Sequence, residues 1–200
     1  NIEQTSSEPT AEYKSRLVSG KKLLDLTGGF GVDSYFFSKK MKQVTHCEIN
    51  AELSEIASHN FEMLGNKNID CVPVNGIEFL KDTTENFDWI YVDPSRRNDK
   101  KGKVFLLEDC LPNLPEHLPL LFDKTEKILV KTSPLFDIKK GIGELDFIKE
   151  VHVVAVHNEV KELLFVLEKG YRGSIEIKTA DLYQEQINSF DFELGDEQEV

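Results

Sequence analysis

Strand-like and helix-like segments alternate through the first half of this 200-residue chain. Apolar, strand-like segments lie at 21–27, 43–49, 68–74 and 87–93, and helix-like segments separate them at 32–41, 50–65 and 76–82. The segment at 50–65 shows helical spacing of its apolar residues and ends at Gly65, a common helix terminator. This alternation predicts an α/β fold in which helices cover both faces of a parallel sheet.

Further strands are expected in the second half of the chain. One is predicted at 127–132, shortly before Pro134. The β-rich runs at 151–156 and 163–167 are too close for a crossover helix to join them, so we expect an antiparallel pair. After Gly170, the sequence predicts one strand followed by a polar helix.

A glycine-rich turn follows the first predicted strand. The stretch DLTGGFGVDS places Asp25 at the end of the strand, before Gly28, Gly29 and Gly31. Glycines let a ligand approach the backbone, and the next helix would point its amides into the same space. Glu48 ends the second strand, where a carboxylate can bind both hydroxyls of a ribose. The combination predicts a nucleoside-containing cofactor, although the glycines alone also suit a tight turn in any α/β protein.

The residues around this turn favour a cationic cofactor. The dinucleotide pattern G-x-G-x-x-G is not met, because its third glycine position, counted from Gly29, holds Ser34. The carboxylate of Asp25 would repel a pyrophosphate but attract the ammonium and sulfonium groups of S-adenosylmethionine. We therefore expect S-adenosylmethionine rather than a nicotinamide dinucleotide.

Composition limits the classes of function. The net charge of −12 argues against a large basic surface for nucleic acid, and the one dense basic cluster is RRNDKKGK at 96–103. No apolar run approaches the length that spans a bilayer, and the three cysteines are widely spaced, as suits reduced thiols. His152 and His157 lack metal-ligand spacing with other His or Cys residues. We expect a cytoplasmic protein that binds no metal or membrane.

Several motifs together resemble class I S-adenosylmethionine-dependent methyltransferases. DLTGGFG at 25–31 is similar to motif I, Glu48 to the ribose-binding acid, VNGIEFL at 74–80 to the adenine-side motif and Asp93-Pro94 to motif IV. The upstream TSSEPTAEYKSRLV is similar to the lead-in helix of the trimethylguanosine-synthase-like branch. SSEPTAEYK, DLTGGFGVD, DPSRR, KTSPLFDI and NEVKELL as a set resemble an uncharacterised bacterial group of methyltransferase-like proteins that carry a THUMP-like domain after the catalytic fold.

This resemblance implies a fold, a domain organisation and a set of cofactor contacts. The fold would be a Rossmann-like, seven-stranded, mostly parallel sheet with an antiparallel last strand and helices on both faces. A lead-in helix is expected within 1–22, a methyltransferase domain at 23–169, and a tail or the truncated start of a second domain at 170–200. The implied cofactor-binding residues are Ser7, Asp25, Thr27, Gly28, Gly29, Gly31, Asp33, Glu48, Ile49, Asn75, Gly76 and Asp93.

Individual cofactor roles also follow from the resemblance. Asp25, Gly29 and Gly31 would shape the methionine end of the pocket, and Ile49 would pack on the adenine. Asn75 stands where many relatives have Asp, but an amide can still bind the edge of the adenine.

The end of the fourth strand carries an altered motif. In relatives with an Asp-Pro-Pro-aromatic sequence, the carboxylate and a proline carbonyl accept hydrogen bonds from an exocyclic amine, and the aromatic ring stacks on the base. Asp93 and Pro94 would keep the first two roles, but Ser95 and Arg96 replace the proline and the aromatic residue. Because a guanidinium can stack on a base or bind a phosphate, we expect Arg96 or Arg97 to bind the methyl acceptor. The alternative is that these arginines pair with surface acids.

Three further polar residues are candidates for acceptor binding. Lys131 and Ser133 end the fifth strand on the carboxyl edge of the sheet, where ligands bind in this architecture. Asn158 lies in the connection between the last two strands. A solvated lysine and a plain polar hairpin connection are the competing interpretations.

The sequence thus predicts an S-adenosylmethionine-dependent methyltransferase that acts on a base nitrogen in RNA. Asp93, Pro94 and Arg96 would be its catalytic residues, and Ser95, Arg97, Lys131, Ser133 and Asn158 would help to bind the RNA. The alternative is a non-catalytic cofactor-binding module that presents a surface to RNA or protein.

Overall fold

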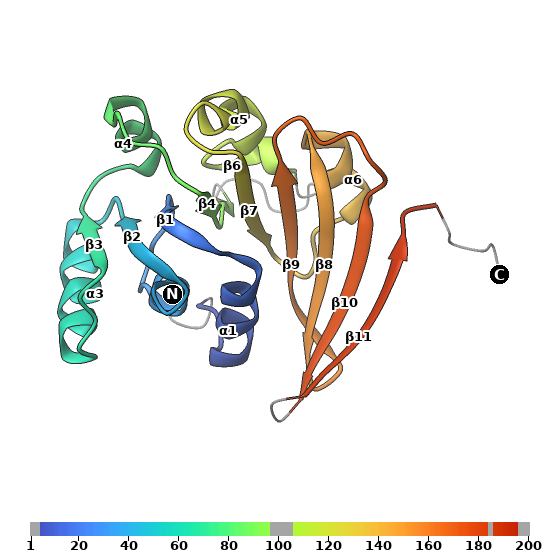
Figure 1. The fold of residues 1–200 in the computed structure, drawn as a ribbon, viewed down its shortest axis with the longest axis horizontal. Helices are drawn as coiled ribbons and strands as arrows, with labels where there is room; N and C mark the ends of the chain where they lie inside the picture. The colour runs from blue at the N-terminus through green and yellow to red at the C-terminus, as the bar shows by residue number, and fades with distance from the viewer. Residues whose placement is uncertain (1–4, 97–105, 184–185, 196–200) are drawn as a thin grey trace. The chain divides into compact units, whose positions relative to one another are not determined.

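The computed structural model describes residues 5–96, 106–183 and 186–195 (Figure 1). The chain divides into two compact units. The first unit comprises Asn1–Asp93 and Pro119–Glu126, and the second comprises Pro94–Leu118 and Lys127–Val200.

Four parallel strands form the sheet of the first unit. They are β1 (Gly20–Asp25), β2 (Met41–Cys47), β3 (Ile69–Val72) and β4 (Trp89–Val92), in the order β4-β1-β2-β3. Each neighbouring pair is parallel, which confirms the prediction from the alternating segments. Because the strands are parallel, the carboxyl ends of all four meet at one edge of this sheet.

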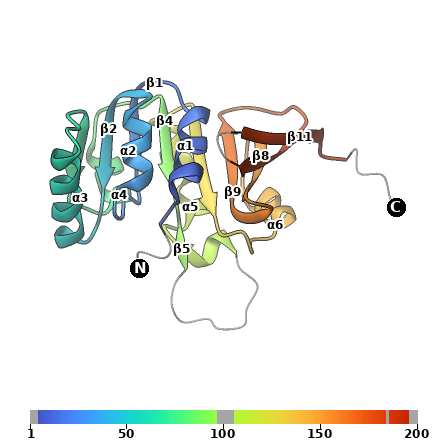
Figure 2. The ribbon, with the colours of Figure 1, turned by 90° about the horizontal axis from the view of Figure 1, so that it is seen from below.

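Helices connect and cover these strands. They are α1 (Glu8–Leu17), α2 (Val32–Ser38), α3 (Ala51–Met63) and α4 (Gly76–Asp82). Figure 1 shows α1 and α4 on opposite sides of the strands. Helix α2 contacts both α1 and β2 (Figure 2). Leu23 and Leu24 of β1 and Phe37 of α2 are fully buried, so this packing forms the core beneath the glycine turn.

The second unit has a sheet of mixed direction. Its strands are β7 (Lys127–Thr132), β8 (Ile148–Val156), β9 (Glu159–Glu168), β10 (Glu176–Tyr183) and β11 (Gln186–Glu193), in the order β11-β10-β8-β9-β7. The short strands β5 (Ser95–Arg96) and β6 (Cys110–Leu111) form a separate pair. The remaining elements are a 3-10 turn at Leu107–Asp109, α6 (Ile138–Glu144), and α5 (Leu114–Phe122), which runs across the division between the units. The predicted antiparallel pair is confirmed, because β9 runs antiparallel to β8.

Two expectations for the second unit are wrong. The polar helix expected after β10 is strand β11, which pairs antiparallel with β10 from Glu176↔Glu193 to Tyr183↔Gln186. This polar segment forms a strand because it pairs with β10. In addition to that pairing, the hydroxyl of Thr179 in β10 donates to the carbonyl oxygen of Phe190 at 2.9 Å and accepts from its amide at 3.1 Å. With β10 and β11 both strands, the described residues form four longer strands in the first unit and five in the second, where the resemblance implied seven in all.

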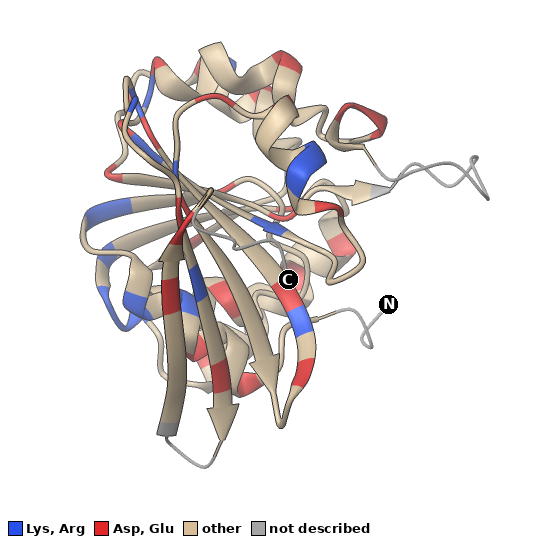
Figure 3. Cartoon of the chain, turned by 90° about the vertical axis from the view of Figure 1, so that its right-hand side faces the viewer, with Lys and Arg blue, Asp and Glu red and all other residues tan. Residues whose placement is uncertain are grey.

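Acidic and basic residues are interleaved along the strands of the second unit (Figure 3). Lys149 pairs with Glu168 at 2.8 Å, and Lys178 pairs with Glu150 at 3.1 Å. Such exposed or half-exposed pairs contribute little stability individually, but they cancel local charge.

Candidate functional site

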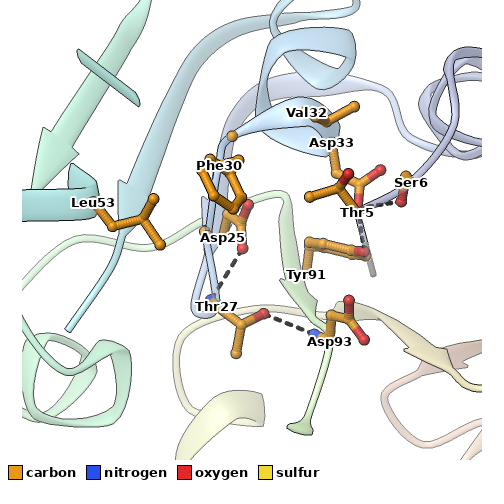
Figure 4. Close-up of a pocket in the computed structure, with 13 residues that line it drawn as sticks. Thr5, Ser6, Asp25, Thr27, Phe30, Val32, Asp33, Leu53, Tyr91 and Asp93 are labelled. Atoms are coloured by element: carbon orange, nitrogen blue, oxygen red, sulfur yellow. Dashed lines mark hydrogen bonds between the residues drawn. The ribbon is translucent and has the colours of Figure 1, made fainter. Parts of the chain in front are cut away.

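The glycine turn between β1 and α2 forms one wall of a pocket in the first unit (Figure 4). Gly31 precedes the first residue of α2 with φ of 80°, in the left-handed region. A Cβ atom there would lie 2.3 Å from Cζ of Phe61, so both the backbone angle and the space require glycine. The residues that line this glycine-turn pocket are Thr5, Ser6, Asp25, Thr27, Gly28, Gly29, Phe30, Gly31, Val32, Asp33, Leu53, Tyr91 and Asp93.

Asp25 lies at the base of the turn and is 1% exposed. Its Oδ1 accepts a hydrogen bond from the Thr27 amide at 3.0 Å, and its Oδ2 accepts from the Ser34 hydroxyl at 2.6 Å. Burial raises the pKa of Asp25 to about 7, with smaller contributions from the nearby charges of Asp33 and Asp93, while the two hydrogen bonds act in the opposite direction. Ser34, at the third glycine position of the dinucleotide pattern, thus organises this acid.

Glu48 connects the end of β2 to the same turn. Its Oε2 accepts from the Gly29 amide at 2.9 Å, and its Oε1 accepts from the Asn50 amide at 2.8 Å. An ionised carboxylate offers about four acceptor positions. Each oxygen of Glu48 therefore has acceptor capacity beyond these two bonds. Ile49, the next residue, is 71% exposed.

Asp93 directly follows β4 and also lines the pocket. Its amide donates to the Thr27 hydroxyl at 2.8 Å, which joins the end of β4 to the glycine turn (Figure 4). The ends of β1 and β4 therefore place the carboxyl groups of Asp25 and Asp93 around one space.

Known proteins share this architecture. A crystal structure of a Porphyromonas gingivalis W83 protein described as a methyltransferase is 34% identical with a TM-score of 0.87, over 96% of this chain and 49% of that chain. The TrmK protein of M. capricolum, solved with S-adenosylhomocysteine, is 16% identical with a TM-score of 0.60, over 84% of this chain and 70% of that one. The chain has the class I methyltransferase fold.

Sequence comparison gives a second relative. A Mycoplasma mobile protein described as an uncharacterized RNA methyltransferase is 36% identical over 92 residues, which are 46% of this chain and 25% of that protein. No family model matches the chain. The chain thus spans about half the length of the P. gingivalis structure, and its match covers a quarter of the Mycoplasma protein. The predicted α/β, Rossmann-like fold class is confirmed.

Within the methyltransferase fold, Asp33 joins three elements at the pocket wall. Its Oδ2 accepts from the Ser6 hydroxyl at 2.9 Å and from the Tyr91 hydroxyl at 2.7 Å, and its Oδ1 lies 3.2 Å from the Lys14 ammonium. Of these partners, sequence reasoning found none. Tyr91 has the sequence pattern of a core residue, and a single lysine in a polar helix gives no signal that it is buried.

The lead-in segment contributes Thr5 and Ser6 to the pocket. The predicted cofactor residue Ser7 is exposed, and its hydroxyl lies 3.2 Å from that of Thr10.

Two predicted adenine-side residues have structural roles at the start of α4. The Oδ1 of Asn75 accepts from the Ile77 amide at 2.9 Å and so caps the helix. A Cβ atom on Gly76 would lie 2.4 Å from the carbonyl oxygen of Leu26, so α4 begins directly against the segment after β1.

We expect Gly76→Ala to lower the free energy of unfolding by about 2 kcal/mol, because a rigid backbone oxygen must move to admit the methyl group. Urea unfolding followed by circular dichroism measures this change. Gly143→Ala, at a site with no neighbouring atom within 4 Å, is the control and should not destabilise the protein. Equal stability of Gly76→Ala and the wild type would contradict this account of the packing.

The predicted acceptor-binding residues belong to the second unit. Pro94 is buried, Ser95 is exposed, and Ser95 and Arg96 form β5. Arg97, like the rest of the basic cluster to Lys103, lies outside the described residues. Lys131 lies in β7, and the hydroxyl of Ser133 accepts from the Leu135 amide at 3.3 Å. Asn158 lies in the turn between β8 and β9 with φ of 62°, and its amide donates to Asp181 at 2.9 Å.

In the described parts of the chain, no group of three or more His, Cys, Asp or Glu residues could hold a metal ion. None of the helices in those parts is long and apolar enough to cross a membrane.

Proposed function

We propose that this chain binds S-adenosylmethionine in the glycine-turn pocket and transfers its methyl group. The observation that carries the proposal is the convergence of a glycine turn, Glu48 and Asp93 on the same strand edge of a methyltransferase fold. The TrmK structure with S-adenosylhomocysteine supports the choice of cofactor.

The charge of the pocket supports a cationic ligand. Asp25, Asp33 and Asp93 all line it, and Lys14 is the partner of Asp33. Carboxylates in a partly buried space attract a sulfonium or an ammonium group and repel a pyrophosphate. A thermal-shift comparison should therefore show stabilisation by S-adenosylmethionine or S-adenosylhomocysteine but not by NADH. The reverse result would favour an oxidoreductase.

The nucleoside part of the cofactor would bind beside Glu48. The carboxylate of Glu48 is already oriented by the amides of Gly29 and Asn50, and its remaining acceptor positions suit the two ribose hydroxyls. The exposed side chain of Ile49 is available to pack on the adenine, and Asn75 and Gly76 follow β3 on the same edge.

We expect Glu48→Gln to weaken binding of S-adenosylhomocysteine by about 30-fold. The NH₂ group of the glutamine would face one of the two backbone amides that now donate to Glu48, and the ribose would lose a charged acceptor. Isothermal titration calorimetry measures the dissociation constant. The matched control is Glu55→Gln, on the exposed face of α3, which should bind like the wild type. Unchanged affinity in Glu48→Gln would exclude Glu48 from the cofactor site.

Methyl transfer requires an acceptor nitrogen held in line with the sulfonium. The cofactor supplies an electrophilic methyl group. Asp93 and the Pro94 carbonyl would accept hydrogen bonds from the acceptor amine and aim its lone pair at the methyl carbon. The nitrogen would take the methyl group, the electron pair of the carbon–sulfur bond would stay on sulfur in S-adenosylhomocysteine, and the nitrogen would release a proton to solvent.

We further propose that the acceptor is a base nitrogen in RNA. Support comes from the Mycoplasma relative described as an RNA methyltransferase and from the basic cluster that begins at Arg96. Ser95, Arg96, Arg97, Lys131, Ser133 and Asn158 would contact the RNA. The replacement of the proline and aromatic residue by Ser95 and Arg96 also favours a second candidate, a module that binds the cofactor and RNA without catalysis. Transfer of labelled methyl groups distinguishes the two.

A further inference from the structure

Lys14 is a fully buried cation at the wall of the glycine-turn pocket. Its side chain is 0% exposed, which is rare for a lysine unless an opposite charge or polar atoms accompany it. Its ammonium lies 3.2 Å from Oδ1 of Asp33 and donates to the Ser6 hydroxyl at 3.0 Å. Lys14 is not among the residues that line the pocket, whereas both of these partners are.

The contacts of Lys14 belong to a network that fixes one end of the pocket. Ser6 receives a hydrogen bond from Lys14 and passes one to Asp33, and Tyr91 of β4 donates to the same carboxylate oxygen. Asp33 thereby links the lead-in segment before α1, the first turn of α2, and β4. Loss of the Lys14 ammonium would remove the cation that lies 3.2 Å from Asp33 and the hydrogen bond that Ser6 accepts.

The geometry also indicates which end of the cofactor this network faces. Figure 4 shows Leu53 on one side of the glycine turn and Thr5, Ser6, Asp33 and Tyr91 on the other. Leu53 donates its amide to Asn50, whose own amide binds Glu48, so the Leu53 side is the ribose side in the proposed function. The opposite side, lined by Ser6 and Asp33, would then hold the amino-acid part of the cofactor.

We propose that Lys14 is a positioning residue for the amino-acid end of the cofactor. Its ammonium neutralises Asp33, so that the carboxylate group of the ligand is not repelled there, and it holds Ser6 in the pocket wall. This inference rests on the proposed function, because it assigns a subsite of the same pocket.

The test compares two ligands that differ only at this end. S-adenosylhomocysteine carries the amino-acid part, and 5′-methylthioadenosine has the same nucleoside without it. We expect Lys14→Met and Tyr91→Phe each to weaken S-adenosylhomocysteine binding, by about 10-fold and about threefold respectively, with 5′-methylthioadenosine binding unchanged within twofold. Calorimetry of both ligands gives the ratio of dissociation constants. A ratio equal to that of the wild type in both variants would overturn the inference.

Matched variants separate positioning from general damage. Arg16→Met removes an exposed cation of the same helix, which pairs with Glu12 at 2.7 Å, and should change neither affinity. Glu48→Gln should weaken both ligands equally. If Lys14→Met does not fold, Tyr91→Phe, which removes another contact of Asp33, decides the question by the same ratio. Wild-type protein that binds neither ligand would overturn the proposed function itself.

Discussion

Asp93→Ala is expected to lower the rate of methyl transfer by at least about 100-fold and to leave the affinity for S-adenosylhomocysteine within about threefold of wild type. The carboxylate would be lost as an acceptor for the substrate amine, and positioning contacts of this kind contribute effects of that size. The backbone should hold, because the amide of residue 93 would still donate to the Thr27 hydroxyl. Single-turnover transfer and calorimetry measure the two quantities.

The matched control for this variant is Asp82→Ala, at the exposed end of α4. It removes one acid from the same unit away from the pocket, so both quantities should remain at wild-type values. Transfer at the wild-type rate in Asp93→Ala would assign the acceptor to other residues. A parallel loss of cofactor affinity would instead make Asp93 a cofactor ligand.

Asp25→Asn is expected to stabilise the protein at pH 8 by on the order of 3 kcal/mol. Burial raises the pKa of Asp25 from 3.8 to about 7, so ionisation of this residue at pH 8 is more costly in the folded protein than in the unfolded chain. An asparagine keeps an acceptor for the Thr27 amide, and the Ser34 hydroxyl can rotate to accept from the new NH₂ group. The substitution removes the charge with little change of shape.

The pH dependence follows from the two pKa values. Below pH 3.8, Asp25 is protonated in both states and contributes nothing to the difference. Between about pH 4 and 7 the folded protein keeps a proton that the unfolded chain has released, so the wild type loses stability as the pH rises, and the loss is complete above about 7. Urea unfolding of both proteins should therefore show a gap that widens from pH 4.5 to pH 8. A gap that is the same at both pH values would contradict the buried-acid account.

The same variant should bind the cofactor less tightly. Ionised Asp25 would attract the positive charges of S-adenosylmethionine, so wild-type affinity should increase from pH 6 to pH 8 and that of Asp25→Asn should not. A gain in stability together with a loss of binding is the usual pattern at a functional residue.

Local sequence signals predicted much of the fold. The apolar runs, with the glycine turn and Pro94 as end signals, were sufficient to predict the four parallel strands. The short connection after Val156 was sufficient to predict the antiparallel β8–β9 pair. The helix predicted in place of β11 was wrong because that polar segment becomes a strand only by pairing with β10.

The site was predicted unevenly for the same reason. Asp25, Glu48 and Asp93 are each the last residue of a strand segment or its neighbour, so the topology alone brings them to one edge. Lys14 and Tyr91 each contact Asp33 across segments that are distant in the sequence, and no local pattern encodes such contacts. The burial of Asp25 likewise depends on how α2 packs on the strands.

The most direct test of the central claim is transfer of radiolabelled methyl groups from S-adenosylmethionine to RNA isolated from a strain that lacks this protein. We predict label in the RNA with the wild-type protein and none with Asp93→Ala. Cofactor binding without any label in RNA would contradict methyl transfer to RNA and would favour the non-catalytic module.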